Sequence, residues 1–174
     1  MKRLTVIFLT LMILLPLGAK YSPSFSISGG MESLGMKYHS VRTRVDISAL
    51  SYTMGFVTLS LPVTVSYVAE SNSVKGLVSP VHYKNGVGLD VAFTNATFGL
   101  ACAIYYGYEH FTAGNAMMRY LEIEASPLVR VEEQIALLLP LSYTYTPEGN
   151  EYSLSLRIRI GGGISGARGR RAGV

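Results

Sequence analysis

Hydrophobic and polar residues alternate over most of the chain after residue 20, and this alternation most constrains what the chain can fold into. A period of two is that of a β-strand whose two faces meet different surroundings. It is clear over residues 41–49, 57–67, 87–93, 98–108 and 152–160, and weaker over 21–30, 116–125 and 129–145. The sequence therefore predicts an all-β chain with eight strands.

The connections between these segments alternate in length. Those over 31–40, 69–86, 109–115 and 146–151 are long, whereas those at about 50–55, 94–97 and 126–128 are short. Outer-membrane barrels show this pattern, with long extracellular loops and short periplasmic turns. Most segments also approach the ~9–11 residues that a tilted strand needs to cross a bilayer. We therefore expect a single eight-stranded antiparallel up-and-down transmembrane β-barrel.

The N-terminal residues have the pattern of an export signal. Lys2 and Arg3 precede an apolar run over 4–15, and Pro16-Leu17-Gly18-Ala19 follows. A basic start, an apolar stretch and a small-residue end are the parts of a cleaved signal peptide, which we place at residues 1–19. The run is too short to cross ~30 Å of hydrocarbon as a helix, which argues against a membrane anchor. The barrel is expected over 20–163 and a Gly- and Arg-rich tail over 164–174.

Composition agrees with an exported barrel and excludes some other classes. Only 15% of the residues are charged, whereas about a quarter are charged in ordinary soluble domains. The net charge of +4 comes from the signal and the tail, so no nucleic-acid footprint is indicated. Cys102 is the single cysteine, so no internal disulfide forms. We expect the mature chain in the bacterial outer membrane, after export through the inner membrane.

One face of the strands carries charged residues of both signs. They are Arg42, Arg44, Asp46, Asp90, Glu122, Glu124, Arg157 and Arg159. In a soluble sandwich this face would meet water, but in a membrane barrel lipid takes the apolar face and the charges point inward. An eight-stranded barrel is only wide enough for side chains to fill it, and an unpaired buried ion is costly. We therefore expect a paired network that fills the lumen, with a gated ion path as the alternative.

Aromatic residues cluster near the expected strand ends. The outer group is Tyr67, Tyr106, Tyr108, Tyr143, Tyr145 and Tyr152, and the inner group is Tyr21, Tyr52, Phe56, Phe93 and Phe98. Amphipathic rings favour the headgroup boundary of a bilayer, so two aromatic girdles are expected.

Two prolines fall inside expected strands, at Pro62 and Pro140. Proline cannot donate to a strand ladder, so each position predicts a bulge or the start of a strand.

No catalytic or metal-binding constellation stands out. His39, His82 and His110 all fall in expected outer connections, with no spacing that suggests a metal site. No cofactor is expected, and we do not expect an enzyme. A rim enzyme that pairs His110 with Ser71 or Ser73 remains a minor alternative.

The strands "LSLPVTVSY" and "LLLPLSYTY", the closing "YSLSLRIRIGGGIS" and the rhythm of eight strands resemble the small outer-membrane barrels of the OmpA transmembrane domain, OmpX and OmpW group. The resemblance covers about residues 21–161. It implies a barrel that the outer-membrane assembly machinery folds into outer-membrane lipid. Members of that group usually end on a strand with a terminal aromatic, whereas this sequence ends in "GARGRRAGV".

Several roles remain open. The first is a structural or surface-interacting barrel, in which the connection over 69–86 contacts a host or environmental ligand. An OmpW-like channel for small, hydrophobic molecules is the alternative, and a soluble periplasmic ligand binder is the architectural competitor.

Overall fold

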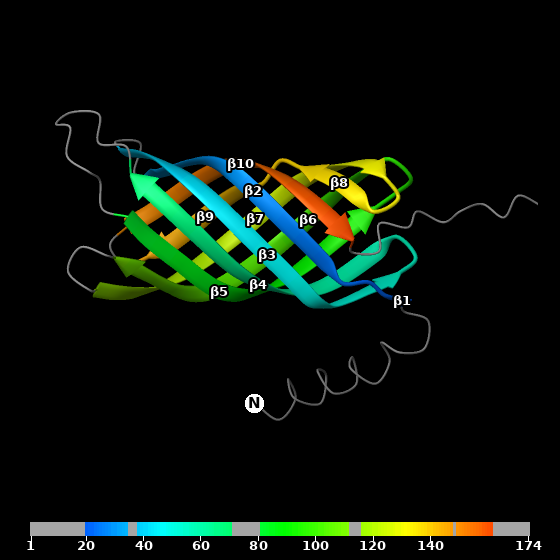
Figure 1. Ribbon diagram of the computed structural model, residues 1–174, viewed down its shortest axis with the longest axis horizontal. Coiled ribbons are helices and arrows are strands. Elements are labelled where there is room, and N and C mark those ends of the chain that lie inside the picture. Colours follow the sequence, from blue (N-terminus) through cyan, green and yellow to red (C-terminus); the bar gives the residue numbers. More distant parts are fainter. Residues whose placement is uncertain (1–19, 35–37, 71–80, 112–115, 148, 162–174) are drawn as a thin grey trace, which may run out of the picture.

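The described residues form a closed antiparallel β-barrel (Figure 1). The computed structural model describes residues 20–34, 38–70, 81–111, 116–147 and 149–161, so the expected signal peptide and tail lie outside the described residues. The strands are β1 (Lys20–Tyr21), β2 (Ser24–Leu34), β3 (Tyr38–Met54), β4 (Val57–Glu70), β5 (Val81–Thr94), β6 (Phe98–Phe111), β7 (Ala116–Glu132), β8 (Ile135–Leu138), β9 (Leu141–Thr146) and β10 (Gly149–Gly161).

From β2 to β7 each strand pairs with the strand that follows it in the chain, and β10 closes the barrel on β2. That closing ladder is continuous, from Glu151 opposite Leu34 to Gly161 opposite Ser24. β8 and β9 both pair with β7 and β10, so they are one strand with a break, and β1 pairs with β3 beyond the start of β2. With each interrupted strand counted once, the barrel has eight strands. The predicted fold class is confirmed.

Short turns join the strands at one end of the barrel, which we call the inner end; the opposite end is the outer end. Gly55 and Phe56 connect β3 to β4, and Gly55 has a φ of 59°, which glycine adopts without strain. Between β5 and β6, Oδ1 of Asn95 accepts hydrogen bonds from the backbone N–H groups of Thr97 (2.9 Å) and Phe98 (2.7 Å). The second turn lies at the predicted position, 94–97, whereas the first was predicted too long, at about 50–55, because residues 50–54 belong to β3.

The third inner connection was predicted wrongly at 126–128. These residues lie within β7, and the turn to β8 follows at residues 133–134. Ser126-Pro127 has the composition of a turn, yet the alternation continues through it, with Ser126 and Leu128 buried. A proline is tolerated at position 127 because it faces the break between β8 and β9. Its carbonyl accepts a hydrogen bond there from the N–H of Leu139 (3.0 Å).

The outer connections were also predicted too long. Residues 31–34, 38–40, 69–70, 81–86, 109–111, 146 and 149–151 belong to strands, which leaves 35–37, 71–80, 112–115 and 147–148. Only 71–80 is much longer than the inner turns. The outer strand ends carry polar and charged residues, and this composition made them resemble loops.

Both internal prolines cause the expected irregularities. The pairing of β3 with β4 shifts by one residue between Ile47 and Leu50, opposite Pro62. Pro140 immediately precedes β9, at the break that separates it from β8. Both predictions are confirmed.

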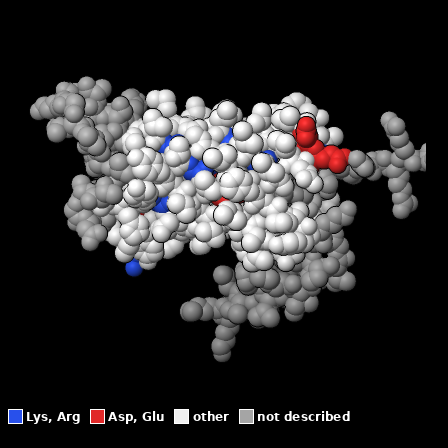
Figure 2. All heavy atoms as spheres, viewed as in Figure 1, with Lys and Arg blue, Asp and Glu red and all other residues white. Residues whose placement is uncertain are grey.

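The barrel has an apolar outer wall and a polar interior. On β10, Leu156 is 57% exposed and Ile158 42%, whereas Arg157 between them is 1% exposed. On the face in Figure 2 the wall consists almost entirely of uncharged residues, with few charged atoms visible between them. The prediction that the charged face points inward is therefore confirmed. None of the described segments is a helix with the length and hydropathy to cross a membrane.

Candidate functional site: the charged lumen

A buried salt-bridge network fills the lumen. All eight charged residues that the sequence singled out point inward, and each is at most 7% exposed. β3, β7 and β10 carry most of them, whereas the lumen-facing Ser26 and Ser28 of β2 and Ser66 of β4 are small. The long side chains from one side of the barrel thus reach across to the other.

Arg42 and Arg44 on β3 meet Glu122 on β7 at the centre of the network. Nη2 of Arg42 donates to Oε2 of Glu122 (2.8 Å), and Nη1 of Arg44 donates to Oε1 (2.6 Å). Nε of Arg44 also donates to Oδ1 of Asp46 (2.5 Å), and its guanidinium lies 3.9 Å from the ring centroid of Tyr105. Both oxygens of Glu122 are therefore bound by cations.

Arg157 on β10 binds Glu124 with two parallel hydrogen bonds, of 2.6 and 2.7 Å. Its Nε lies 3.5 Å from Oδ2 of Asp46, and Ser126 donates to Glu124 (2.9 Å). Such a two-point contact is the strongest geometry for an arginine and a carboxylate. The central cluster of Arg42, Arg44, Asp46, Glu122, Glu124 and Arg157 holds three cations and three anions, so its charge balances.

Below the central cluster, toward the inner turns, Arg159 pairs with Asp90 (2.5 Å). The interior then becomes apolar on one side, where Ala92, Ala101, Leu128, Ala136 and Leu138 pack together. On the other side, hydroxyl groups pair, as in Ser51 with Ser60 (2.8 Å) and Thr53 with Thr58 (3.0 Å). The inner end of the lumen is therefore packed with protein atoms.

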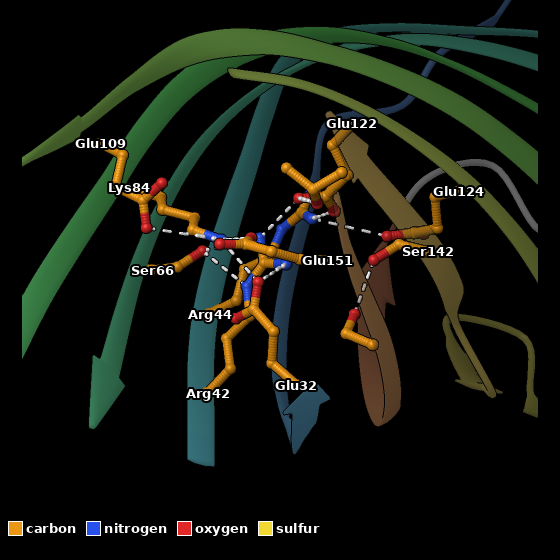
Figure 3. A network of polar contacts seen from close by, with 12 residues as sticks. Glu32, Arg42, Arg44, Ser66, Lys84, Glu109, Glu122, Glu124, Ser142 and Glu151 are labelled. Carbon is orange, nitrogen blue, oxygen red and sulfur yellow. Dashed lines mark hydrogen bonds and ion pairs between the residues drawn. The ribbon is translucent and has the colours of Figure 1, made fainter. Parts of the chain in front are cut away.

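A second charged cluster at the outer end was missed by the sequence reasoning. Figure 3 shows Glu32, Glu109 and Glu151 directed toward the ammonium group of Lys84. Its Nζ lies 2.5 Å from Glu32 and 3.6 Å from Glu109, and it also donates to Glu151. We call these four residues the outer cluster. His82 was expected in a loop but lies in β5, with its Nε2 2.9 Å from Glu109.

The strand period places the outer cluster in the lumen once the strands are extended to their true ends. Counting back from Asp90 in steps of two leads to Lys84 and His82, and counting back from Arg157 leads to Glu151. The same count on β2 continues from Ser28 to Glu32. These residues were assigned to connections because their polar composition ended each strand too early.

The other two histidines are also in strands rather than connections. His39 lies in β3, and His110 lies in β6 with its side chain exposed on the outer wall. Ser71 and Ser73, the imagined partners of His110, lie outside the described residues. In the part of the chain that the structure describes, no three His, Cys, Asp or Glu residues are grouped to hold a metal ion.

Little free space remains inside the central cluster. A cavity of ≈ 10 Å³ lies among its charged groups and beside Ser28, Ser153 and Ser155. That volume accommodates about one water molecule.

The predicted aromatic residues lie on the outer wall. At the outer end, five of the six tyrosines are exposed and Tyr143 is half-buried; the exposed ones are Tyr67, Tyr106, Tyr108, Tyr145 and Tyr152. At the inner end, four of the five aromatic residues are exposed and Tyr52 is half-buried; the exposed ones are Tyr21, Phe56, Phe93 and Phe98. Neighbouring rings contact each other, as in Tyr143 with Tyr152 (centroids 5.3 Å apart) and Tyr67 with Tyr83 (5.4 Å). Tyr83 was missed because its strand was taken for a loop.

No protein-family model matches this chain, and no curated protein matches it in sequence. Solved structures do match. The crystal structure of Neisserial surface protein A (NspA) superposes with a TM-score of 0.52 at 14% identity, over 82% of this chain and 98% of that one. The N-terminal β-barrel domain of Pseudomonas aeruginosa OprF gives a TM-score of 0.50 at 13% identity, again over 82% and 98%. The fold is that of the small eight-stranded outer-membrane β-barrels. At such low identity the likeness concerns the fold alone.

Proposed function

We propose that this chain is an outer-membrane protein with a sealed barrel, and that its role is structural or surface-interacting rather than conducting. The observation that carries the proposal is the inverted distribution of side chains. Leu100, Leu156 and Ile123 on the wall are between 44% and 57% exposed, whereas Arg157 and Glu122 are at most 1% exposed. In water such a wall would be an apolar patch far larger than soluble proteins tolerate, but lipid accepts it.

The close packing of side chains inside the barrel supports the proposal that the lumen is sealed. Conduction needs a continuous aqueous path, whereas the central cluster leaves space for about one water molecule. Toward the inner turns, Leu128 and Leu138 are at most 2% exposed and pack with three alanines. Opening this path would require breaking buried ion pairs, which is costly.

The sequence of residues 1–19 supports export, and insertion into outer-membrane lipid then depends on the outer-membrane assembly machinery. A host or environmental ligand would meet the outer end of the barrel, where the connection at 71–80 is the longest. The structure does not describe that connection, so the contact is proposed from its length and position in the chain.

Cell fractionation combined with a heat-shift gel tests the location. We expect the protein in the outer-membrane fraction, resistant to alkaline extraction, and migrating differently before and after boiling. Recovery in the soluble periplasmic fraction would instead favour a soluble ligand binder.

Planar-bilayer recording tests the sealed lumen. We expect no steady conductance from the purified barrel. Discrete channels, or barrel-dependent entry of small hydrophobic molecules into vesicles, would favour the OmpW-like alternative.

A further inference from the structure

Arg119 is a charged residue on a wall that is mostly apolar. It lies on β7 next to Tyr120, which is 2% exposed and faces the lumen, so the side chain of Arg119 is on the outer wall. The next outward-facing residues of β7 are Leu121 and Ile123. An arginine in contact with lipid hydrocarbon is costly, and its long side chain extends toward the headgroups.

The neighbours of Arg119 form a polar and aromatic patch at the outer end of three strands. Arg119 lies directly opposite Tyr108 of β6, and His110 of β6 lies directly opposite Tyr83 of β5. All four side chains are exposed on the same face. Residues opposite each other in an antiparallel pair have Cβ atoms about 4.5–5.5 Å apart, and Tyr108 and His110 are successive outward-facing residues of β6, so the four side chains lie side by side. We call these four residues the rim patch.

No described carboxylate compensates the charge of the rim patch. The acidic side chains that the structure describes at this end of the barrel, those of Glu32, Glu109 and Glu151, are all buried in the lumen. Among the described residues, Arg119 forms no ion pair. Among the described side chains, the positive charge of the rim patch is therefore not compensated.

Arg130, at the inner end of the same strand, differs from Arg119 in its hydrogen bonds. Its Nε donates to the carbonyl of Glu132 (3.3 Å) and its Nη1 to the carbonyl of Ala96 (3.5 Å). The guanidinium of Arg130 is thus held by backbone groups of the neighbouring turns, whereas that of Arg119 is not.

We propose that the rim patch binds the phosphate group of a membrane lipid. The planar guanidinium of Arg119 matches two phosphate oxygens, and the hydroxyls of Tyr83 and Tyr108 lie where rings favour the headgroup boundary. His110 adds a further donor. The inference rests on the proposed function, because it requires that the wall below Arg119 meets lipid.

Native mass spectrometry of the purified barrel in detergent micelles tests the site. Dioleoyl phosphatidic acid and dioleoyl phosphatidylcholine are added at equal concentrations, and bound lipid is counted. We expect the wild type to retain phosphatidic acid in preference. Arg119→Gln should lower that affinity about fivefold, since one basic residue near an anionic lipid surface contributes ~1 kcal/mol.

Two matched variants and one competitor sharpen the result. Arg119→Lys should keep part of the preference, because it keeps the charge but loses the two-point contact. Arg130→Gln should leave it unchanged. Millimolar inorganic phosphate should not displace the lipid, since the acyl chains hold the headgroup at the wall.

Equal binding of the two lipids by the wild type would overturn the proposal. An equal loss of affinity for phosphatidic acid in Arg119→Gln and Arg130→Gln would also overturn it. Displacement by inorganic phosphate would also overturn it, because the patch would then be a free-anion site. Failure of the proposed function has a different signature. In that case even the wild type would show no heat shift and would not need detergent to stay soluble.

Discussion

Removing the guanidinium of Arg157 should destabilise the barrel strongly, because it breaks the charge balance of the central cluster. Arg157→Met keeps an unbranched side chain but deletes the two hydrogen bonds to Glu124 and the contact with Asp46. Three carboxylates then face the two guanidiniums of Arg42 and Arg44.

The expected loss in the free energy of unfolding depends on the contacts that Glu124 keeps in Arg157→Met. Deleting one partner of a buried ion pair costs about 3–5 kcal/mol. Glu124 still accepts a hydrogen bond from Ser126 (2.9 Å) and lies 3.5 Å from Nη1 of Arg44, so the lower end applies, about 3 kcal/mol. Glu124→Gln should cost a similar amount, because it leaves a guanidinium in excess.

The double variant decides between lost charge balance and lost packing. With Arg157→Met and Glu124→Gln together, two cations again face two anions, so the combined loss should be smaller than the sum of the single losses by about 2 kcal/mol. Urea unfolding of the barrel in lipid vesicles gives each free energy of unfolding. Arg130→Met, on an arginine outside the lumen, is the control and should change it by less than about 0.5 kcal/mol. Strict additivity, or a loss in Arg157→Met no larger than in Arg130→Met, would refute the reasoning.

Three further predictions use the same unfolding assay. Lys84→Met leaves the three carboxylates of the outer cluster without their shared ammonium and should cost at least about 3 kcal/mol, and Glu151→Gln in the same chain should recover part of that loss. Gly107→Ala should destabilise by about 1–3 kcal/mol, because its Cβ would lie 1.9 Å from the carbonyl oxygen of Asn85, whereas Gly29→Ala, with nothing within 4 Å, should be neutral. Ile123→Lys places a charge on the wall and should cost about 2–4 kcal/mol in vesicles if that position lies near the bilayer midplane, while an unchanged free energy of unfolding would contradict a lipid-facing wall.

The direction of each side chain could be predicted from the sequence, because it follows from covalent geometry. Successive residues of an extended strand point to opposite faces, so one correctly placed residue fixes all the others. Arg157 and Glu122 were assigned to the lumen on this basis, and they lie there. The same rule places Lys84 and Glu151 in the lumen once their strands are extended to their true ends.

The strand ends could not be predicted, because composition does not mark them in a barrel. Ser126-Pro127 looks like a turn, yet neighbouring strands on both sides hold its backbone in the sheet. Lys84 and Glu109 look like loop residues, yet each finds a buried partner of opposite charge. Both cases depend on residues that are distant in sequence, and local patterns do not contain that information.

The partners within the lumen could not be read from the sequence either, although the need for partners could. An interior that holds only side chains must match long residues with short ones across its width. Arg42 extends past Ser66 to reach Glu122, eighty positions further along the chain. Closure of β10 on β2 adds contacts of this kind, because it brings Nε of Arg157 to within 3.5 Å of the carboxylate of Asp46 on β3. The charge balance of the central cluster is therefore a property of the closed barrel. A variant that cannot pair β10 with β2 should expose uncompensated charge along its whole interior, so closure and ion pairing should be lost together in a single unfolding transition.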